Sequence, residues 1–202
     1  MESSILRGLS SLMNRVRCPW STTDPLLQQY HDEEWGLPQR EERALFELLC
    51  LEGAQAGLSW RTILHKRAAY REVFYQFDPL LVANIDERQQ QALRQDARII
   101  RNEAKIRAFV ENAKIWVAAR GDGMDWPAYL WSFVGGEASH PGWQDGAAIP
   151  AETDASLAMS HALRKMGFRF VGPKICYAFM QASGMVNDHV RDCFRFSQII
   201  AL

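Results

Sequence analysis

The sequence predicts an all-α, two-lobed helical domain. Apolar residues recur at helical spacing along most of the 202 residues, and no segment shows the sustained alternation of a β-strand. Capping side chains or prolines precede these patterns, and glycines follow them. Near the C-terminus two patterns are joined by only six residues, GFRFVG, which predicts a helix-hairpin-helix unit at about 154–184.

The first part of the chain is loop-rich through His31, and helices follow it. The patterns predict helices near 40–53, 59–75, 79–96, 102–121 and 125–134. Asp78 with Pro79 opens the third of these, and Asn102 opens the fourth, which ends at Gly121. Residues 135–150 are rich in glycine and proline and have no apolar period, so they predict a surface loop.

The helix-hairpin-helix unit begins at Thr153 or Asp154, either of which can cap a helix, and its second helix begins at Pro173. The predicted buried positions are Met159, Ala162, Leu163 and Met166 on the first helix, and Cys176, Phe179 and Met180 on the second. A hairpin followed by a helix N-terminus presents free N–H groups that can hold a phosphate. The nearby basic residues are Arg164, Lys165, Arg169 and Lys174. An ordinary pair of helices with solvated basic residues is the alternative interpretation, and the hairpin pattern by itself favours it.

Composition limits the classes of function. The chain is 48% hydrophobic, which suffices for one buried core, and we expect a single soluble domain over 17–202. Its net charge of -1 gives no overall attraction to nucleic acid, so DNA binding would need a local basic surface. No run approaches the roughly 18 apolar residues of a membrane span. Residues 1–16 lack a continuous apolar run, which favours a flexible leader, with an organelle transit peptide as the alternative.

Cysteine and histidine positions suggest a metal site. Four cysteines spaced this widely favour a reducing compartment over a disulfide scaffold, and Cys50 and Cys176 lie in apolar runs where buried thiols are common. The remaining candidate ligands are Cys18, His31, His189 and Cys193. The last two are four residues apart, so on a helix they would share one face. All four could form a closed structural site that ties the N-terminal loop to the C-terminal segment, or they are two unrelated pairs of core residues.

Glu52 is the most informative single residue, because it interrupts the apolar helical run FELLCLEGAQAGLSW. Aromatic and amide side chains lie near it in the sequence: Trp20, Tyr30, Trp35, Gln55 and Trp60. A carboxylate among π-faces suits a flat, cationic ring that donates hydrogen bonds, such as an N-alkylated purine. A solvated glutamate near a helix end is the alternative interpretation.

Five segments carry a resemblance to a known family. They are RCPW at 17–20, DPLLQQYHDEEWG at 24–36, LFELLCLEGAQAGLSW at 45–60, YLWSFV at 129–134 and GFRFVGPKICYAFMQASGMVNDHV at 167–190. From Arg17 to about Cys193 the chain closely resembles the 3-methyladenine DNA glycosylase I family. The resemblance implies an all-α member of the helix-hairpin-helix superfamily. Such a monomeric, bacterial cytoplasmic enzyme would excise 3-methyladenine from alkylated double-stranded DNA and leave an abasic site without a lyase step.

The resemblance also implies roles for individual residues. It implies structural zinc on Cys18, His31, His189 and Cys193. Glu52 would hydrogen-bond the excised base as the catalytic residue, with Tyr30 and Trp60 lining or stacking on the base and Trp20 closing the pocket. Leu58 would wedge into the gap left by the flipped nucleotide, with Gln55 beside it. Gly172, Lys174 and Arg169 of the hairpin would contact DNA.

The segment after the hairpin departs from the wider superfamily. Many relatives have a catalytic aspartate in a V-D-x-H stretch, whereas this chain has Asn187 at that position, followed by Asp188. We expect Asp188 to cap a helix. The missing carboxylate is tolerable, because an N3-methylated adenine is already positively charged and leaves as a neutral base. A zinc-stabilised damage-binding module without cleavage, and a zinc-dependent hydrolase with an open coordination position, are the competing interpretations.

Overall fold

A computed structural model describes residues 15–202, and most of the predicted leader therefore lies outside the described residues. Over this range the chain is all-α, as predicted, with one isolated bridge between Ser139 and Val186. The α-helices are α2 (Pro25–Glu33), α3 (Glu42–Gln55), α4 (Trp60–Val73), α5 (Pro79–Ala83), α6 (Glu87–Leu93), α7 (Glu103–Gly121), α8 (Trp126–Ser132), α9 (Asp154–Lys165), α10 (Pro173–Ala182) and α11 (Phe194–Ile200). Short 3-10 turns are η1 (Pro19–Ser21), η2 (Tyr75–Phe77) and η3 (Gly146–Ala148).

Capping side chains begin several helices where the sequence predicts them. The carboxylate of Asp78 accepts hydrogen bonds from the first backbone N–H groups of α5, and the side-chain oxygen of Asn102 does so for α7. Thr153 begins α9 in the same way. Such caps satisfy N–H groups that have no partner inside the helix. The capping residues therefore determine where α5, α7 and α9 begin.

The single helix predicted over 79–96 is wrong, because the chain forms α5 and α6 there with a break between them. Asp86 causes the second start. Its Oδ1 accepts from the N–H of Gln89 at 2.7 Å, and Oε1 of Gln89 accepts from the N–H of Asp86 at 2.9 Å. This reciprocal capping box begins a new helix within an apolar pattern that is otherwise continuous.

The predicted loop-rich start through His31 is also wrong, because α2 occupies residues 25–33. Asp24 caps it with Oδ1 and uses Oδ2 to accept from Arg61 at 2.7 Å and His65 at 2.9 Å on α4. The same carboxylate thus starts α2 and docks it on a second helix. At the other end of the chain, α11 follows Cys193 and was not predicted.

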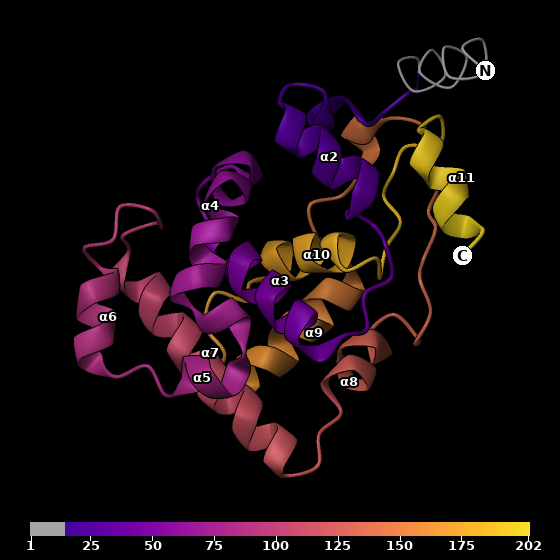
Figure 1. The fold of residues 1–202 in the computed structure, drawn as a ribbon. Helices are drawn as coiled ribbons and strands as arrows, with labels where there is room; N and C mark the ends of the chain where they lie inside the picture. The colour runs from indigo at the N-terminus through magenta and orange to yellow at the C-terminus, as the bar shows by residue number, and fades with distance from the viewer. Residues whose placement is uncertain (1–14) are drawn as a thin grey trace, which may run out of the picture.

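The helices form two groups around one continuous hydrophobic core (Figure 1). Helices α4–α7 lie to one side, and α2 and α8–α11 lie to the other. Helix α3 packs against both α4 and α10 and so joins the groups. In the helix-hairpin-helix unit α9 packs on α10. The predicted Met159, Leu163, Cys176, Phe179 and Met180 are buried, whereas Ala162 and Met166 are only partly so.

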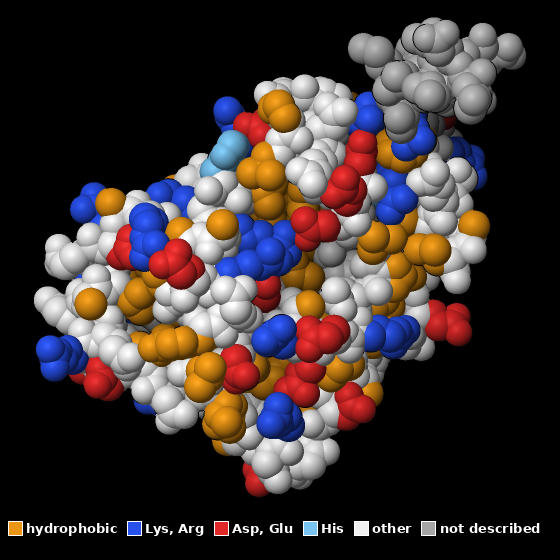
Figure 2. Space-filling model, viewed as in Figure 1, with side chains coloured by type: hydrophobic (Ala, Val, Ile, Leu, Met, Phe, Trp, Pro, Cys, Tyr) orange, Lys and Arg blue, Asp and Glu red, His pale blue; other side chains and the backbone are white. Residues whose placement is uncertain are grey.

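The surface matches the near-zero net charge. Figure 2 shows basic and acidic side chains interspersed over the face in view. None of the helices described is both long enough and apolar enough to cross a lipid bilayer.

Candidate functional site

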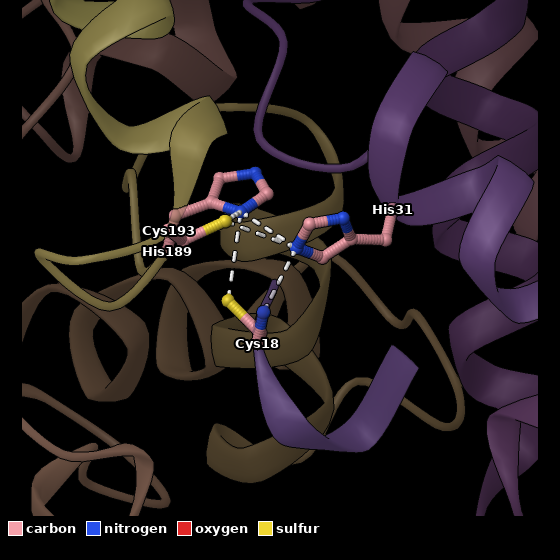
Figure 3. A group of neighbouring side chains, drawn as sticks. All are labelled: Cys18, His31, His189 and Cys193. Carbon is pink, nitrogen blue, oxygen red and sulfur yellow. Dashed lines mark hydrogen bonds between the residues drawn. The ribbon is translucent and has the colours of Figure 1, made fainter. Parts of the chain in front are cut away.

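The four predicted metal ligands meet in one buried cluster and point toward one another (Figure 3). The potential ligand atoms of Cys18, His31, His189 and Cys193 all lie within 4.8 Å of one another. Nδ1 of His189 is 3.1 Å from Nε2 of His31, 3.6 Å from Sγ of Cys18 and 3.5 Å from Sγ of Cys193. Tetrahedral zinc would place neighbouring sulfur and nitrogen ligands roughly 3.3–3.8 Å apart. The cluster can therefore hold one metal ion in a closed site.

The outward nitrogen of each imidazole has a partner. Nδ1 of His31 lies 2.8 Å from Oδ1 of Asp32, and Nε2 of His189 lies 3.0 Å from the carbonyl oxygen of Trp35. A proton on each outward nitrogen leaves the inward nitrogen free to bind a metal. Contacts with Cys18 and the two imidazoles also lower the pKa of the Cys193 thiol, which favours the thiolate that metals bind.

The local structure around the ligands differs from the prediction. His31 lies on α2 rather than in a loop, whereas His189 and Cys193 lie in an irregular segment before α11 rather than on one helix face. The N–H of Phe194 donates to the carbonyl of Val16 at 3.0 Å, which joins the two ends of the described chain beside the cluster. The predicted link between the N- and C-terminal segments is confirmed. His189 and Cys193 are brought together by a turn, however, and not by one face of a helix.

A cavity of about 360 Å³ lies next to the cluster, where the two helix groups meet. Its walls come from α2 and the turn that follows it, from α3, α4 and α10, and from η1 and the loop around η3. The lining residues are Trp20, Tyr30, Trp35, Glu52, Gln55, Trp60, Gly146, Ile149, Ala178 and Gln181. The structure thus brings together Glu52 and all five residues that the sequence grouped around it.

Glu52 is buried in the last turn of α3, with 3% of its surface exposed. Its Oε2 is buried and has no hydrogen-bond partner within the described part of the chain. Burial raises the pKa of this carboxyl group to about 8, because the charged form loses its hydration. The alternative of a solvated glutamate is therefore wrong. A buried carboxyl group that lines a cavity and has an oxygen without a partner is typical of a ligand-binding site.

Aromatic rings surround the carboxyl group. The ring centroids of Tyr30 and Trp60 are 5.3 Å apart, and those of Trp20 and Trp35 are 5.0 Å apart. Nε1 of Trp60 is also buried without a partner among residues 15–202. Burial and the nearby Glu52 raise the pKa of Tyr30, so its hydroxyl group stays protonated. The walls of the cavity therefore carry π-faces, and two of the lining residues, Glu52 and Trp60, each hold a buried polar atom without a partner in the described residues.

The residues expected to contact DNA lie outside the cavity, with one exception. Leu58 is 41% exposed in the turn between α3 and α4, while Gln55 lines the cavity beside it. Arg169 and Lys174 are exposed at the hairpin, and Gly172 is the residue before α10. The exposed segments could reach a ligand too large for the cavity.

Asp188 does not cap a helix, contrary to the prediction. It is fully buried, and both of its oxygens accept hydrogen bonds. Oδ1 accepts from Nε1 of Trp143 at 2.8 Å, while Oδ2 accepts from the hydroxyl of Tyr177 at 2.6 Å and from Nε2 of Gln181 at 2.8 Å. These bonds join the loop over residues 135–150 to α10. Asp188 therefore positions two walls of the cavity.

Sequence reasoning missed four lining residues. Gly146 and Ile149 belong to a segment whose composition indicated only a surface loop. Ala178 and Gln181 are three residues apart on α10, and a lone polar residue in the run YAFMQA was a signal that could have identified Gln181.

Taken together, these features define an all-α protein with a helix-hairpin-helix unit, a buried Cys2His2 cluster and an aromatic cavity around one carboxyl group. A sequence profile of the methyladenine glycosylase family matches residues 20–196, and the chain belongs to this family. It is 49% identical to DNA-3-methyladenine glycosylase 1 of Escherichia coli (strain K12) over 177 residues, which cover 88% of this chain and 95% of that protein.

Solved structures agree with this assignment. A crystal structure of 3-methyladenine DNA glycosylase I superposes with a TM-score of 0.87 at 48% identity, covering 89% of this chain and 98% of the other. A tyrosine-to-phenylalanine variant of 3-methyladenine DNA glycosylase I, solved in complex with 3-methyladenine, gives a TM-score of 0.85 at 33% identity, covering 88% and 96%.

Proposed function

We propose that this chain is a monofunctional DNA glycosylase that flips 3-methyladenine out of alkylated DNA and hydrolyses its N-glycosidic bond. The observation that carries the proposal is the buried carboxyl group of Glu52, with an unused oxygen, inside an aromatic cavity. The relatives named 3-methyladenine DNA glycosylase, and the relative bound to 3-methyladenine, supply the identity of the base.

Charge selects the damaged base. N3-methylation gives the adenine of the nucleotide a positive charge, which aromatic faces attract and an ionised Glu52 stabilises. Because burial raises the pKa of Glu52 to about 8, the free site resists ionisation until a cationic ligand enters. Tyr30 and Trp60 line or stack on the base and Trp20 closes the pocket. Neutral adenine lacks the charge that offsets desolvation of the carboxylate.

The cleavage step needs little acid catalysis. When the C1′–N9 bond breaks, its electron pair neutralises the methylated base, which leaves uncharged. A water oxygen then bonds to the electron-poor C1′ and loses a proton, which leaves an abasic site. Since no lysine is among the lining residues, the cavity has no amine positioned to form a Schiff base. This supports hydrolysis without a lyase step.

DNA contact involves two exposed segments. Leu58 enters the gap left by the flipped nucleotide, with Gln55 beside it. Gly172, Arg169 and Lys174 of the hairpin bind a backbone phosphate of the same double-stranded DNA. The protein acts as a monomer and one domain over 17–202, in the cytoplasm of a bacterium, where its substrate lies.

The metal is zinc, held by Cys18, His31, His189 and Cys193. Two thiolates and two imidazoles are a ligand set that zinc favours, and four protein ligands leave no open position for a reacting water. The zinc therefore stabilises the fold beside the cavity and takes no part in hydrolysis.

Single-turnover release of free base from alkylated duplex DNA tests the function. We expect release of 3-methyladenine, with much slower release of 7-methylguanine and hypoxanthine, whose nucleotides present different edges to Glu52. Retention of 3-methyladenine in DNA that the protein nonetheless binds would identify a damage-binding module instead.

A further inference from the structure

Helix α7 carries two buried polar side chains, Lys105 and Asn112, that bond to the backbone of segments outside α7. They are seven residues apart, so they lie on nearly the same face of the helix, separated by roughly 10 Å along its axis. Lys105 bonds to the turn before Leu58, and Asn112 bonds to the hairpin. These are the two segments that the proposed function assigns to DNA contact.

Lys105 holds the end of α3. Its Nζ donates to the carbonyl oxygens of Ala54 and Ala56, both at 2.7 Å, and only 7% of the residue is exposed. Carbonyls at a helix C-terminus lack partners inside the helix and attract a positive charge. The next residue is Gly57 with φ +75°, and Leu58 follows. The ammonium group therefore fixes the backbone position from which Leu58 extends.

Asn112 holds the hairpin in a similar way. Its Nδ2 donates to the carbonyl of Arg169 at 3.0 Å, and its Oδ1 accepts from the N–H of the same residue at 2.8 Å. The next residue, Phe170, has φ +54°, a left-handed conformation that is unfavourable for a residue with a side chain. Such a conformation persists only where the surroundings hold it. The paired bonds from Asn112 provide that support.

A second contact relates the hairpin to the cavity. A Cβ atom on Gly53 would lie only 3.2 Å from Cβ of Phe170, so the hairpin rests directly on the α3 turn that contains Glu52. The turn before Leu58, the hairpin and the carboxyl group thus share one rigid support.

We propose that Lys105 and Asn112 are positioning residues that set the distance between Leu58 and the phosphate-binding hairpin, so that both engage one DNA duplex simultaneously. This inference rests on the proposed DNA contacts. Both side chains bond to main-chain atoms, so they fix where each segment lies whatever side chains it carries. A purely apolar contact would fill the space without fixing these carbonyl and N–H groups.

The two variants Lys105→Met and Asn112→Asp test the inference. Methionine keeps the length of the lysine side chain but has no donor, and aspartate keeps the shape of asparagine but cannot donate to the carbonyl of Arg169 when ionised. Lys114→Met is the matched control, because Lys114 lies on the exposed side of α7. Binding of free 3-methyladenine, followed by tryptophan fluorescence, reports on the cavity alone.

The two variants should impair different steps. We expect Asn112→Asp to weaken binding to a duplex with an abasic analogue by about tenfold and to raise KM, as loss of backbone-fixing bonds predicts. Lys105→Met should lower kcat by about tenfold and suppress the fluorescence rise of a 2-aminopurine placed opposite the analogue. Free-base binding should change clearly less than duplex binding or kcat in both variants, since neither side chain lines the cavity.

Equal loss of free-base binding and duplex binding in either variant would overturn the inference, as would duplex binding, kcat and 2-aminopurine fluorescence like those of the parent. If a variant does not fold, Lys105→Arg or Asn112→Gln replaces it. These variants keep the donors but displace the bonded backbone, so the same separation of duplex and free-base effects is expected. If the parent binds this duplex and raises the 2-aminopurine fluorescence yet releases no 3-methyladenine from alkylated DNA, the proposed activity fails, while duplex binding and fluorescence still test the positioning roles.

Discussion

The metal cluster and the cavity are neighbours that satisfy their polar atoms in opposite ways. They share two tryptophans: the ring of Trp20 lies 5.5 Å from that of His31, and the ring of Trp35 lies 4.6 Å from that of His189, while both tryptophans also line the cavity. In the cluster, the outward imidazole nitrogens have partners in the protein. In the cavity, Glu52 and Trp60 each keep a buried polar atom without one.

This difference separates stability from function. Groups that the protein satisfies itself contribute to folding, and removing one leaves its partner uncompensated. Groups left without a partner cost folding free energy and are retained where a ligand completes them. Substitutions in the cluster should therefore change stability first, whereas substitutions in the cavity should change base release first.

The largest effect is expected for Cys193→Ser. Loss of one of four zinc ligands should remove most of the metal-binding free energy, destabilising the fold by on the order of 5 kcal/mol or more. Zinc content and thermal unfolding of the purified protein measure this. Cys50→Ala, at a buried cysteine outside the cluster, is the control and should cost only about 1 kcal/mol. A fully stable Cys193→Ser protein that has lost only activity would instead indicate a catalytic metal.

Glu52→Gln should produce the opposite result. Without a carboxylate to stabilise the cationic base, single-turnover release of 3-methyladenine should fall about a hundredfold or more. The melting temperature should stay the same near neutral pH, where the buried carboxyl group is mostly neutral like glutamine, and should rise relative to the parent at higher pH, where that carboxyl group ionises. Parallel losses of stability and activity would show that Glu52 supports the fold rather than the reaction.

The pH dependence sharpens the same contrast. The ordinary pKa of the Glu52 carboxyl is 4.5, and burial raises it to about 8 in the folded protein, so the folded state holds its proton more tightly than the unfolded state. The stability from neutral Glu52 is therefore complete below pH 4.5 and is lost as pH rises toward about 8.

Activity should change in the reverse direction. Because the ionised carboxylate is the form that stabilises the base, kcat/KM should rise with pH and level off above about 8. Glu52→Gln should show no such rise. A parent profile that is flat between pH 6 and 9 would separate the carboxylate from the reaction.

Short-range signals predicted much of the fold and site. Capping at Asp78 and Asn102, and glycines around the hairpin, act within a few residues, so the sequence displays them directly. The same is true of Glu52, whose helical run also supplies Gln55 and leads to Trp60. The position of Asp86 shows the limit, because a capping box overrode an apolar pattern that by itself indicated one helix.

The parts that could not be predicted depend on packing between distant segments. His189 and Cys193 meet through a turn, although their spacing equally suits a helix. Gln181 reaches the cavity, and Asp188 fixes it, only because α10 lies beside the segment that leads to α11. In the sequence, Lys105 cannot be told from an ordinary charged residue on a helix surface. Its role depends on the contact with the end of α3, which only the folded structure shows.

The smallest and most discriminating effect is expected from a pair of tryptophans. Nε1 of Trp60 has no partner in the described residues, whereas Nε1 of Trp131 donates to the carbonyl of Gln39 at 2.8 Å. Trp60→Phe keeps an aromatic face and breaks no bond in the free protein, so stability should change by less than about 1 kcal/mol. If the base completes this donor, its release should slow about two- to tenfold, the value of one neutral hydrogen bond.

Trp131→Phe should have the reverse effect. It removes a satisfied donor and leaves the partly buried carbonyl of Gln39 without this partner, which should lower the free energy of unfolding by about 2 kcal/mol. Base release below the unfolding transition should be unchanged. Measuring melting temperature and single-turnover rate for both variants therefore tests whether unused and satisfied polar atoms divide function from stability here. If both variants change the melting temperature alone, or both change the single-turnover rate alone, unused and satisfied polar atoms do not divide function from stability in this protein.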